Sequence, residues 1–204
     1  LEPMVSGVVA ADLDAAGGVA GSEVAAAALV AVARQAGGEM NIKRIVGHLF
    51  TTHGKVNRAF PRDTLIAIEK AIKACDAEHV GDVCFAIEGA LHSTALFNGQ
   101  SARDRAVEVF SQLRVWDTEH NNGVLIYVLL ADRDVEIVAD RGVHAKVSSQ
   151  EWQAICHTME EAFRQGAYRD GTISGIQAVA QLLKRHFPAH RGSTNELPDT
   201  PTIL

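Results

Sequence analysis

The sequence predicts an α/β protein, a three-layer αβα sandwich in which helices cover both faces of a small mixed β-sheet. An unbroken apolar run over residues 123–131 has the pattern of a central strand that is buried on both faces. An earlier strand over residues 83–90 is separated from it by a helix, which implies a parallel pair with a right-handed crossover. Alternating apolar residues over 134–139 follow a charged turn, which indicates an antiparallel hairpin strand.

Helical periodicity accounts for most of the chain between and around these strands. Pro61 suits the first turn of a helix, and Ser101 is a typical N-cap residue. Ser148 and Glu151 have the spacing of a capping box, and Gly166 is expected to end that helix. We therefore expect five helices, over residues 42–50 (before a turn at Gly54), 61–75, 101–114, 148–166 and 172–185.

The composition is that of a soluble globular protein, with 47% hydrophobic and 22% charged residues. A chain of 204 residues is long enough to bury a core without disulfides or metals. Its 3 cysteines are far apart and form no C-x-x-C pair, which favours a reducing compartment. The 25 acidic and 19 basic residues argue against duplex nucleic acid as a partner, because phosphate contacts require a basic face.

Composition divides the chain into three parts. Residues 1–39 are rich in alanine and glycine and lack aromatic residues, so we expect a weakly ordered arm with one helical stretch over 24–35. Residues 40–187 hold the periodic elements, and residues 188–204, rich in proline, are expected to form a disordered tail. A transmembrane helix needs about 20 apolar residues in a row, and every apolar run in this sequence is much shorter. The arm also lacks the basic start of a signal peptide, so we expect a cytoplasmic protein.

The first candidate site is the charged turn of the predicted hairpin. Asp132, Arg133 and Asp134 follow the central strand, and ligands of open α/β sheets bind outside the carboxyl ends of strands. The alternative is a turn in which the aspartates bond their own backbone. A second polar cluster is expected at the opposite edge of the sheet, where an ion pair that caps a strand end is the alternative; it comprises Asp140, Arg141, Asn121, Asn122, Asp117 and Glu119.

Nucleophile and nucleotide-binding motifs are absent from the sequence. G-x-S-x-G, G-x-x-x-x-G-K and G-x-G-x-x-G do not occur. His92 and His144 lie in expected loops, where either could exchange protons at neutral pH, although a solvated loop histidine is the simpler interpretation. Cys84 lies in an expected strand, where a buried thiol acts as a small hydrophobe.

The chain resembles the TPM-domain family over roughly residues 60–187. The resemblance rests on residues 121–142, NNGVLIYVLLADRDVEIVADRG, and on residues 168–183, YRDGTISGIQAVAQLL. Before them come a helix, a strand and an F-x-x-W-like helix end in the order typical of the family, at 65–75, 83–90 and 110–116. The resemblance implies an α/β domain. Family members are mostly membrane-associated, secreted or lumenal, and some are similar to proteins linked with photosystem II repair. Acid phosphatase activity and divalent-cation binding are attributed to some members.

The sequence departs from the family pattern at two places that bear on chemistry. Many relatives carry an acidic pair in a D-D-x-G-like turn before the first domain helix, whereas this chain has VNRAF over residues 56–60. Arg58 in that turn would repel Mg²⁺ or Ca²⁺, which need several oxygen ligands. The W-G-x-G loop of the family is replaced by WDTEH over residues 116–120.

An intact fold with an altered catalytic pattern predicts a non-enzymatic accessory domain that acts with a protein partner. Residues 40–58 combine basic and apolar side chains, so they could lie on an anionic membrane surface; a helix packed on the domain is the alternative. We expect no cofactor. The rival hypothesis is a phosphatase that depends on Ca²⁺ or Mg²⁺, with Asp132, Asp134 and Asp140 as candidate metal ligands.

Overall fold

The structure is a computed structural model that describes all residues except 1–41, 50, 52, 77 and 190–194. Residues 40–204 group as one compact unit by their contacts. The described residues form eight helices and four strands, in the order α2 (Ile42–Leu49), α3 (His53–Ala59), α4 (Arg62–Asp76), β1 (Asp82–Glu88), α5 (Ser93–Phe97), α6 (Ala102–Gln112), β2 (Gly123–Leu129), β3 (Asp134–Ala139), α7 (Arg141–His144), α8 (Ser149–Arg164), α9 (Tyr168–His186) and β4 (Thr202–Ile203).

The strands form one mixed sheet in the order β3-β2-β1-β4. β1 and β2 are parallel, with Asp82 opposite Gly123 and Glu88 opposite Leu129. β3 is antiparallel to β2. Every residue of β2 is buried, as expected for a strand that has neighbours on both edges and helices on both faces. The predicted parallel pair and antiparallel hairpin strand are confirmed.

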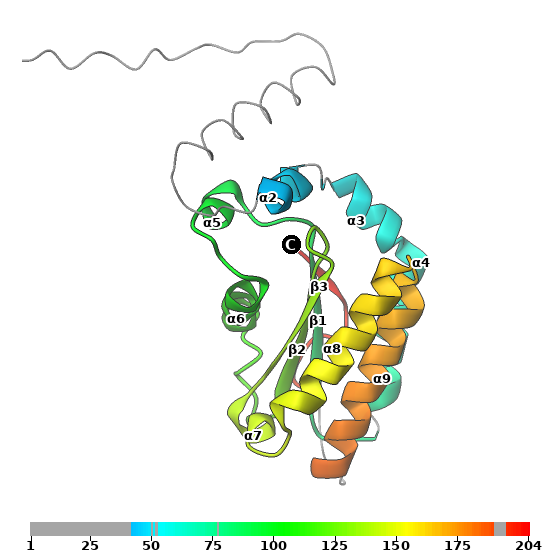
Figure 1. Cartoon of the computed structure of the whole chain (residues 1–204). Helices are drawn as coiled ribbons and strands as arrows, with labels where there is room; N and C mark the ends of the chain where they lie inside the picture. Colours follow the sequence, from blue (N-terminus) through cyan, green and yellow to red (C-terminus); the bar gives the residue numbers. More distant parts are fainter. Residues whose placement is uncertain (1–41, 50, 52, 77, 190–194) are drawn as a thin grey trace, which may run out of the picture. The chain divides into compact units, whose positions relative to one another are not determined.

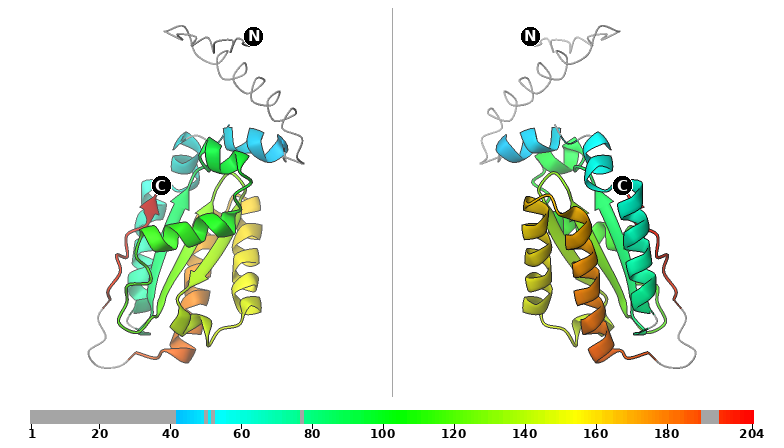
Figure 2. Two further views of the ribbon diagram at one scale, coloured as in Figure 1. Left: turned by 90° about the vertical axis from the view of Figure 1, so that its left-hand side faces the viewer. Right: turned by 90° about the vertical axis from the view of Figure 1, so that its right-hand side faces the viewer.

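Helices cover both faces of the sheet, which gives the predicted three-layer sandwich. α6, the crossover between the parallel strands, lies on one face, and α4, α8 and α9 lie on the other (Figure 1). α2, α3 and α5 lie beyond the end of the sheet where β1 and β2 terminate (Figures 1 and 2). This end carries the candidate site described below.

An aromatic cluster joins the start of α4 to the turn between α8 and α9. Phe60 is buried, with its ring centroid 6.3 Å from that of Phe85 and 6.1 Å from that of Phe163. Tyr168 packs against both Phe60 and Phe163, at 5.6 and 5.2 Å. Removing a buried phenylalanine ring from such a cluster typically costs about 3–5 kcal/mol. The cluster therefore holds the segment before α4 firmly against the hairpin of α8 and α9.

Capping residues begin two of the helices as predicted. The Ser148 hydroxyl accepts a hydrogen bond from the Glu151 N–H, and the Glu151 carboxylate accepts from the Ser148 N–H, which completes a capping box. Ser101 forms a second capping box, with Asp104 as its partner. Each box satisfies two backbone N–H groups that would otherwise lack partners.

The short helices differ from the prediction. Gly54 lies inside α3 rather than in a turn, and α5 and α7 occupy segments expected to be loops. One or two turns are too short for a periodic apolar stripe, so the pattern could not indicate them. α7 instead begins because the Asp140 carboxylate accepts the Arg141 N–H at 2.7 Å.

The C-terminal segment also differs from the prediction of a disordered tail over 188–204. The Glu196 N–H donates to Asp82 Oδ1 at 3.1 Å, and β4 pairs parallel with β1. The Leu204 N–H donates to the Ile87 carbonyl at 2.9 Å. The tail is ordered over residues 195–204 because it completes the open edge of β1, which its own proline-rich composition does not reveal. The predicted arm over 1–39, with its helix over 24–35, lies outside the described residues.

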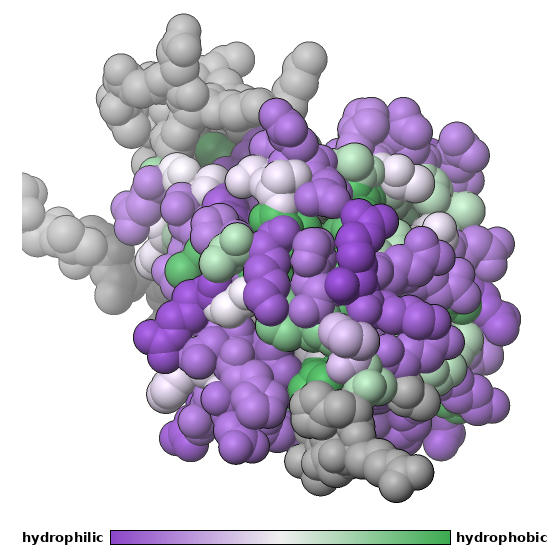
Figure 3. All heavy atoms as spheres, turned by 90° about the horizontal axis from the view of Figure 1, so that it is seen from below, coloured by the Kyte–Doolittle hydropathy of each residue, from purple (hydrophilic) through white to green (hydrophobic). Residues whose placement is uncertain are grey.

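The surface at the end of the molecule opposite α2, α3 and α5 is mostly hydrophilic (Figure 3). Seen from below, it shows only scattered apolar side chains among polar ones (Figure 3). Among the described residues no helix is both long and apolar enough to cross a bilayer.

Candidate functional site

The candidate site lies at the carboxyl ends of the two parallel strands. The Leu130 N–H donates to the Glu88 carbonyl at 2.9 Å, and the Ala131 N–H donates to the Gly89 carbonyl at 3.0 Å. The segments that leave β1 and β2 therefore stay paired for two residues beyond the sheet. In α/β sheets the space outside such strand ends is the usual place for a ligand.

A hydrogen-bonded bridge connects α2 to both of these segments. Asp132 Oδ1 accepts from His48 Nε2 at 2.9 Å, and Asp132 Oδ2 accepts from Arg44 Nε at 2.9 Å. The Leu91 N–H donates to His48 Nδ1 at 3.0 Å, so Nδ1 is the unprotonated nitrogen and the proton lies on Nε2. Burial alone raises the pKa of Asp132, but the hydrogen bonds from His48 and Arg44 outweigh it and hold this pKa below its usual range.

On one side of the bridge lies a cavity of about 740 Å³, here called the cationic cavity. Lys55 and Arg58 from α3 and Arg133 from the hairpin turn line it, with Asp132 as its one carboxylate. Within the part of the chain that the structure describes, none of these three basic side chains forms an ion pair. Their charges therefore stay available to a ligand.

Two backbone features add to the cationic cavity. Arg133 has a φ of 54°, in the left-handed region that costs a residue with a Cβ about 1–2 kcal/mol. Gly166 and Tyr168, on either side of the α9 N-cap, also line the cavity, and α9 has no side-chain cap. The N-terminus of a 19-residue helix carries partial positive charge. The cavity therefore combines three basic side chains with the positive end of a helix.

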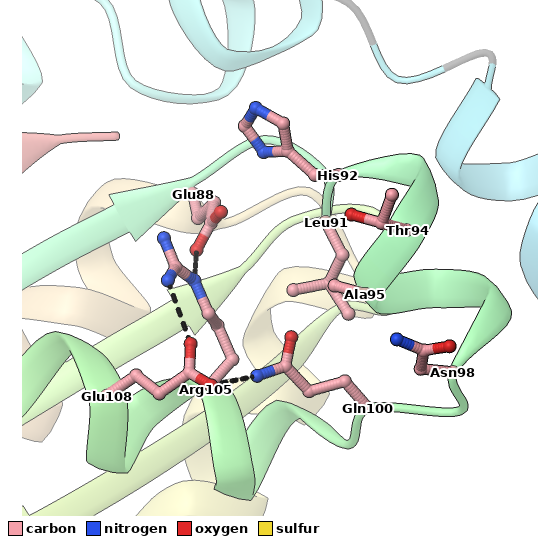
Figure 4. A pocket seen from close by; sticks show the side chains of 9 residues that line it. All are labelled: Glu88, Leu91, His92, Thr94, Ala95, Asn98, Gln100, Arg105 and Glu108. Atoms are coloured by element: carbon pink, nitrogen blue, oxygen red, sulfur yellow. Dashed lines mark hydrogen bonds and ion pairs between the residues drawn. The ribbon is translucent and has the colours of Figure 1, made fainter.

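On the other side of the bridge lies a cavity of about 630 Å³, here called the Glu88 cavity (Figure 4). Glu88 is the last residue of β1 and its side chain is only 4% exposed. Its Oε2 accepts from the Tyr127 hydroxyl at 2.7 Å and from Arg105 Nε at 2.8 Å. Arg105 also donates to Glu108 at 3.1 Å. Both cavities are within the size range of small-molecule sites in proteins.

The aspartates proposed as metal ligands do not form one site. Asp132 has both oxygens engaged by Arg44 and His48. Asp134 begins β3 and Asp140 follows its end, so they lie about 20 Å apart at 3.3 Å per residue. Burial, followed by repulsion from Glu136 and Glu160, raises the pKa of Asp134 to about 6.

The donor set of the described residues therefore does not fit the divalent cation that the resemblance implies. Within the described residues no three His, Cys, Asp or Glu side chains are grouped to hold a metal ion. Asp132 is itself bonded to Arg44, and the basic residues that line the same cavity repel a cation.

The second polar cluster lies at the opposite end of the sheet, where the antiparallel pairing predicted it. Arg141 Nε donates to Asn121 Oδ1 at 2.7 Å. Asn122 Nδ2 donates to the Val80 carbonyl at 2.6 Å, inside the fold. Asp117 closes a turn with the Arg114 carbonyl, and the Glu119 N–H donates to Glu196. With Asp140 as the cap of α7, these side chains satisfy turns and element ends.

Sequence reasoning missed the partners of Asp132. Arg44 and His48 are spaced i, i+4 on one helix face, but they are 88 and 84 residues from Asp132, and nothing local connects the two segments. Glu88 carried a stronger signal, because it interrupts an apolar strand at its carboxyl end. His92 and His144 are both exposed at the surface, as solvated histidines are; His92 lies in a loop as expected, whereas His144 is the last residue of α7.

These features define a small α/β sandwich domain with two ligand-sized cavities at the carboxyl ends of its parallel strands. A family model described as the TPM domain matches residues 57–182, and the chain belongs to this family. The match begins at Asn57, so Arg58, which lies in α3 rather than in the expected turn, is within the family region.

The chain is similar to solved structures of other proteins. The NMR structure of the BA42 protein from the psychrophilic bacterium Bizionia argentinensis is 28% identical, with a TM-score of 0.61. The alignment covers 70% of this chain and 93% of that one. The solution NMR structure of the N-terminal domain of a P. gingivalis protein is 20% identical, with a TM-score of 0.39 and coverage of 59% and 94%. No curated protein sequence matches the chain.

Proposed function

We propose that this TPM domain is an accessory binding domain whose cationic cavity holds an anionic group of its partner without hydrolysing it. The observation that carries the proposal is the set of three basic side chains, Lys55, Arg58 and Arg133, around one cavity of about 740 Å³. Guanidinium groups bind phosphate oxygens in a bidentate manner, so a phosphate group is the anion that this set suits best.

The same geometry argues against hydrolysis in this cavity. A hydrolase needs a base that can take a proton from water or from a nucleophile. Asp132 is the one carboxylate in the lining, and the hydrogen bonds from His48 and Arg44 that lower its pKa make it a weak base. The cavity therefore supports recognition of an anion better than cleavage of an ester.

A phosphate group could come from a soluble molecule or from a lipid headgroup. Ile45 and Val56, apolar side chains of the 40–58 segment, are buried in the domain and cannot insert into a bilayer. Contact of these two positions with a membrane is therefore excluded, and we propose that contact of the segment depends on its charge. Peripheral membrane association remains part of this proposal, and so does a protein partner that carries the anion.

The test begins with calorimetric titration of inorganic phosphate into the wild-type protein and into Arg58→Gln and Lys70→Gln variants. Lys70 is an exposed base on α4 outside the cavity, so its loss is the matched charge control. We expect saturable binding that weakens at least tenfold in Arg58→Gln and is unchanged in Lys70→Gln. Absence of saturable binding, or an equal effect of both substitutions, would overturn the proposal.

Two further experiments test whether the phosphate group belongs to a lipid and whether the protein is a phosphatase instead. Flotation with phosphatidylglycerol vesicles should carry the wild type, and carry Arg58→Gln less, only if a lipid headgroup is the source. Turnover of 4-nitrophenyl phosphate with Ca²⁺, Mg²⁺ or Mn²⁺ should be absent. Metal-dependent turnover that Asp132→Asn abolishes would establish the phosphatase hypothesis in place of the binding domain.

A further inference from the structure

The Glu88 cavity contains a buried carboxylate with one unused oxygen. Oε2 of Glu88 already accepts two hydrogen bonds, from Tyr127 and Arg105, whereas Oε1 has no hydrogen-bond partner among the described residues. Figure 4 shows the second oxygen of Glu88 directed away from Arg105, on the side where His92 and Leu91 lie. Because the Glu88 side chain is only 4% exposed, this oxygen is a strong acceptor, since the low dielectric around it strengthens its bond to a donor.

The polar lining as a whole, Glu88 included, is rich in acceptors and carries negative charge. Glu88 and Glu108 face a single guanidinium, that of Arg105, so these three side chains carry a net charge of -1. Gln100 Nε2 donates to Glu108 at 2.6 Å, so the remaining polar atom of the Gln100 amide is its carbonyl oxygen. The hydroxyl of Thr94 and the amide of Asn98 line the same cavity.

The opposite wall is apolar. Leu91 is buried and, with the methyl group of Ala95, lies across the cavity from the Arg105 network (Figure 4). An alkyl chain can cover this wall while a cationic head reaches the carboxylate. The cavity thus has the two parts that an alkylamine needs, an apolar surface next to a desolvated anion.

We propose that the Glu88 cavity binds a ligand through a primary ammonium group. The ammonium donates to Glu88 Oε1 and to the carbonyl oxygen of Gln100, and the attached methylene groups pack on Leu91 and Ala95. Arg105 pairs with the carboxylate and orients it. This site is independent of the cationic cavity, which lies beyond the bridge of His48 and Asp132 and takes the opposite charge.

The experiment is a titration of the ¹⁵N-labelled protein with n-butylamine, followed by amide chemical shifts, with n-butanol as the uncharged analogue of the same shape. We expect saturable shifts at Leu91, His92 and Thr94 with the amine, and binding of the alcohol at least tenfold weaker. Inorganic phosphate should leave these amides unchanged. Equal affinity for amine and alcohol, or shifts scattered over the acidic surface, would contradict the site.

Variants locate the binding. Glu88→Gln keeps an acceptor for Tyr127 but removes the charge, and should weaken amine binding at least tenfold. Glu161→Gln is the matched control, because Glu161 is an exposed acid on α8 outside the cavity. Ala95→Phe fills the cavity without changing its charge and should also abolish binding. Full affinity in a folded Glu88→Gln or in a folded Ala95→Phe protein overturns the proposal.

Discussion

His48 donates its Nε2–H to Asp132 Oδ1 across 2.9 Å, and this bond joins α2 to the hairpin turn between β2 and β3. The other ring nitrogen of His48 accepts the Leu91 N–H, so the imidazole also contacts the segment after β1. One side chain thus holds together the two loops that leave the parallel strands. Asp132, at one end of this bridge, lines the cationic cavity, and Leu91, at the other end, lines the Glu88 cavity.

The Asp132 carboxylate should stabilise the fold at neutral pH. We expect Asp132→Asn to lower the free energy of unfolding by about 1–3 kcal/mol at pH 7, because Arg44 loses a charged partner that is only 17% exposed. The pKa of Asp132 is lower in the folded protein, so its contribution is present above the unfolded pKa of about 4 and is lost as pH falls through the folded pKa. Urea unfolding should therefore separate the two proteins at pH 7, and the difference should shrink as pH falls below about 4. Asp117→Asn, at an exposed position, should change stability by less than about 0.5 kcal/mol.

Replacing Arg133 with glycine should raise the stability of the protein and lower its affinity for phosphate. Its φ of 54° is disfavoured for any residue with a Cβ, so Arg133→Gly should raise the free energy of unfolding by about 1 kcal/mol. Arg133→Ala removes the charge but keeps the backbone strain, so its stability should be close to that of the wild type. Both variants should lower phosphate affinity if the charge binds the anion. Unchanged affinity in both would exclude Arg133 from the site.

Local patterns were sufficient to predict the layers of the fold. The run at 123–131 reads as a buried strand because both of its faces need apolar side chains, and the capping serines begin helices through bonds within four residues. β4 was missed because its stability comes from the free edge of β1, more than 110 residues earlier in the chain. A pairing over that distance leaves no periodicity in the segment itself.

The candidate site could be predicted only in part, for a similar reason. The position of Asp132 after a central strand pointed to the correct end of the sheet. Its role depends on Arg44 and His48, which the packing of α2 brings to it. The sequence indicates that Arg58 repels cations. Only the structure shows that Arg58, Lys55 and Arg133 line the same cavity.

The C-terminal segment should protect the edge of β1. Deleting residues 195–204 removes β4 and the Glu196 N–H that Asp82 accepts, and it exposes unpaired backbone groups of an apolar strand. We expect the shortened protein to self-associate, measured as a higher apparent mass by size exclusion at equal concentration. Ile203→Thr keeps the backbone pairing and replaces a half-exposed side chain, so it should elute like the full chain. Identical elution of the deletion variant would show that β1 needs no cover.

The neighbouring carboxylates of Asp76 and Asp199 should make the free energy of unfolding decrease as pH rises. Burial, followed by the charge of Asp199, raises the pKa of Asp76 to about 7, and Asn195 donates to both side chains. The folded protein therefore retains the Asp76 proton over a pH range in which the unfolded chain has released it. Stability decreases from about pH 4, the unfolded value, to about pH 7 and is level above that.

Asp76→Asn tests this relationship, because asparagine resembles the protonated acid at every pH. The variant should match the wild type at pH 4 and exceed it at pH 8 by on the order of 1 kcal/mol in urea unfolding. Asp63→Asn on the same helix removes an exposed carboxylate and should leave the pH profile unchanged. Buried Asp82, whose pKa burial raises to about 6, contributes a slope of the same sign that persists in the variant. A variant less stable than the wild type at pH 8 would contradict this, because it would mean that the ionised Asp76 stabilises the contact of α4 with Asn195 in the C-terminal segment.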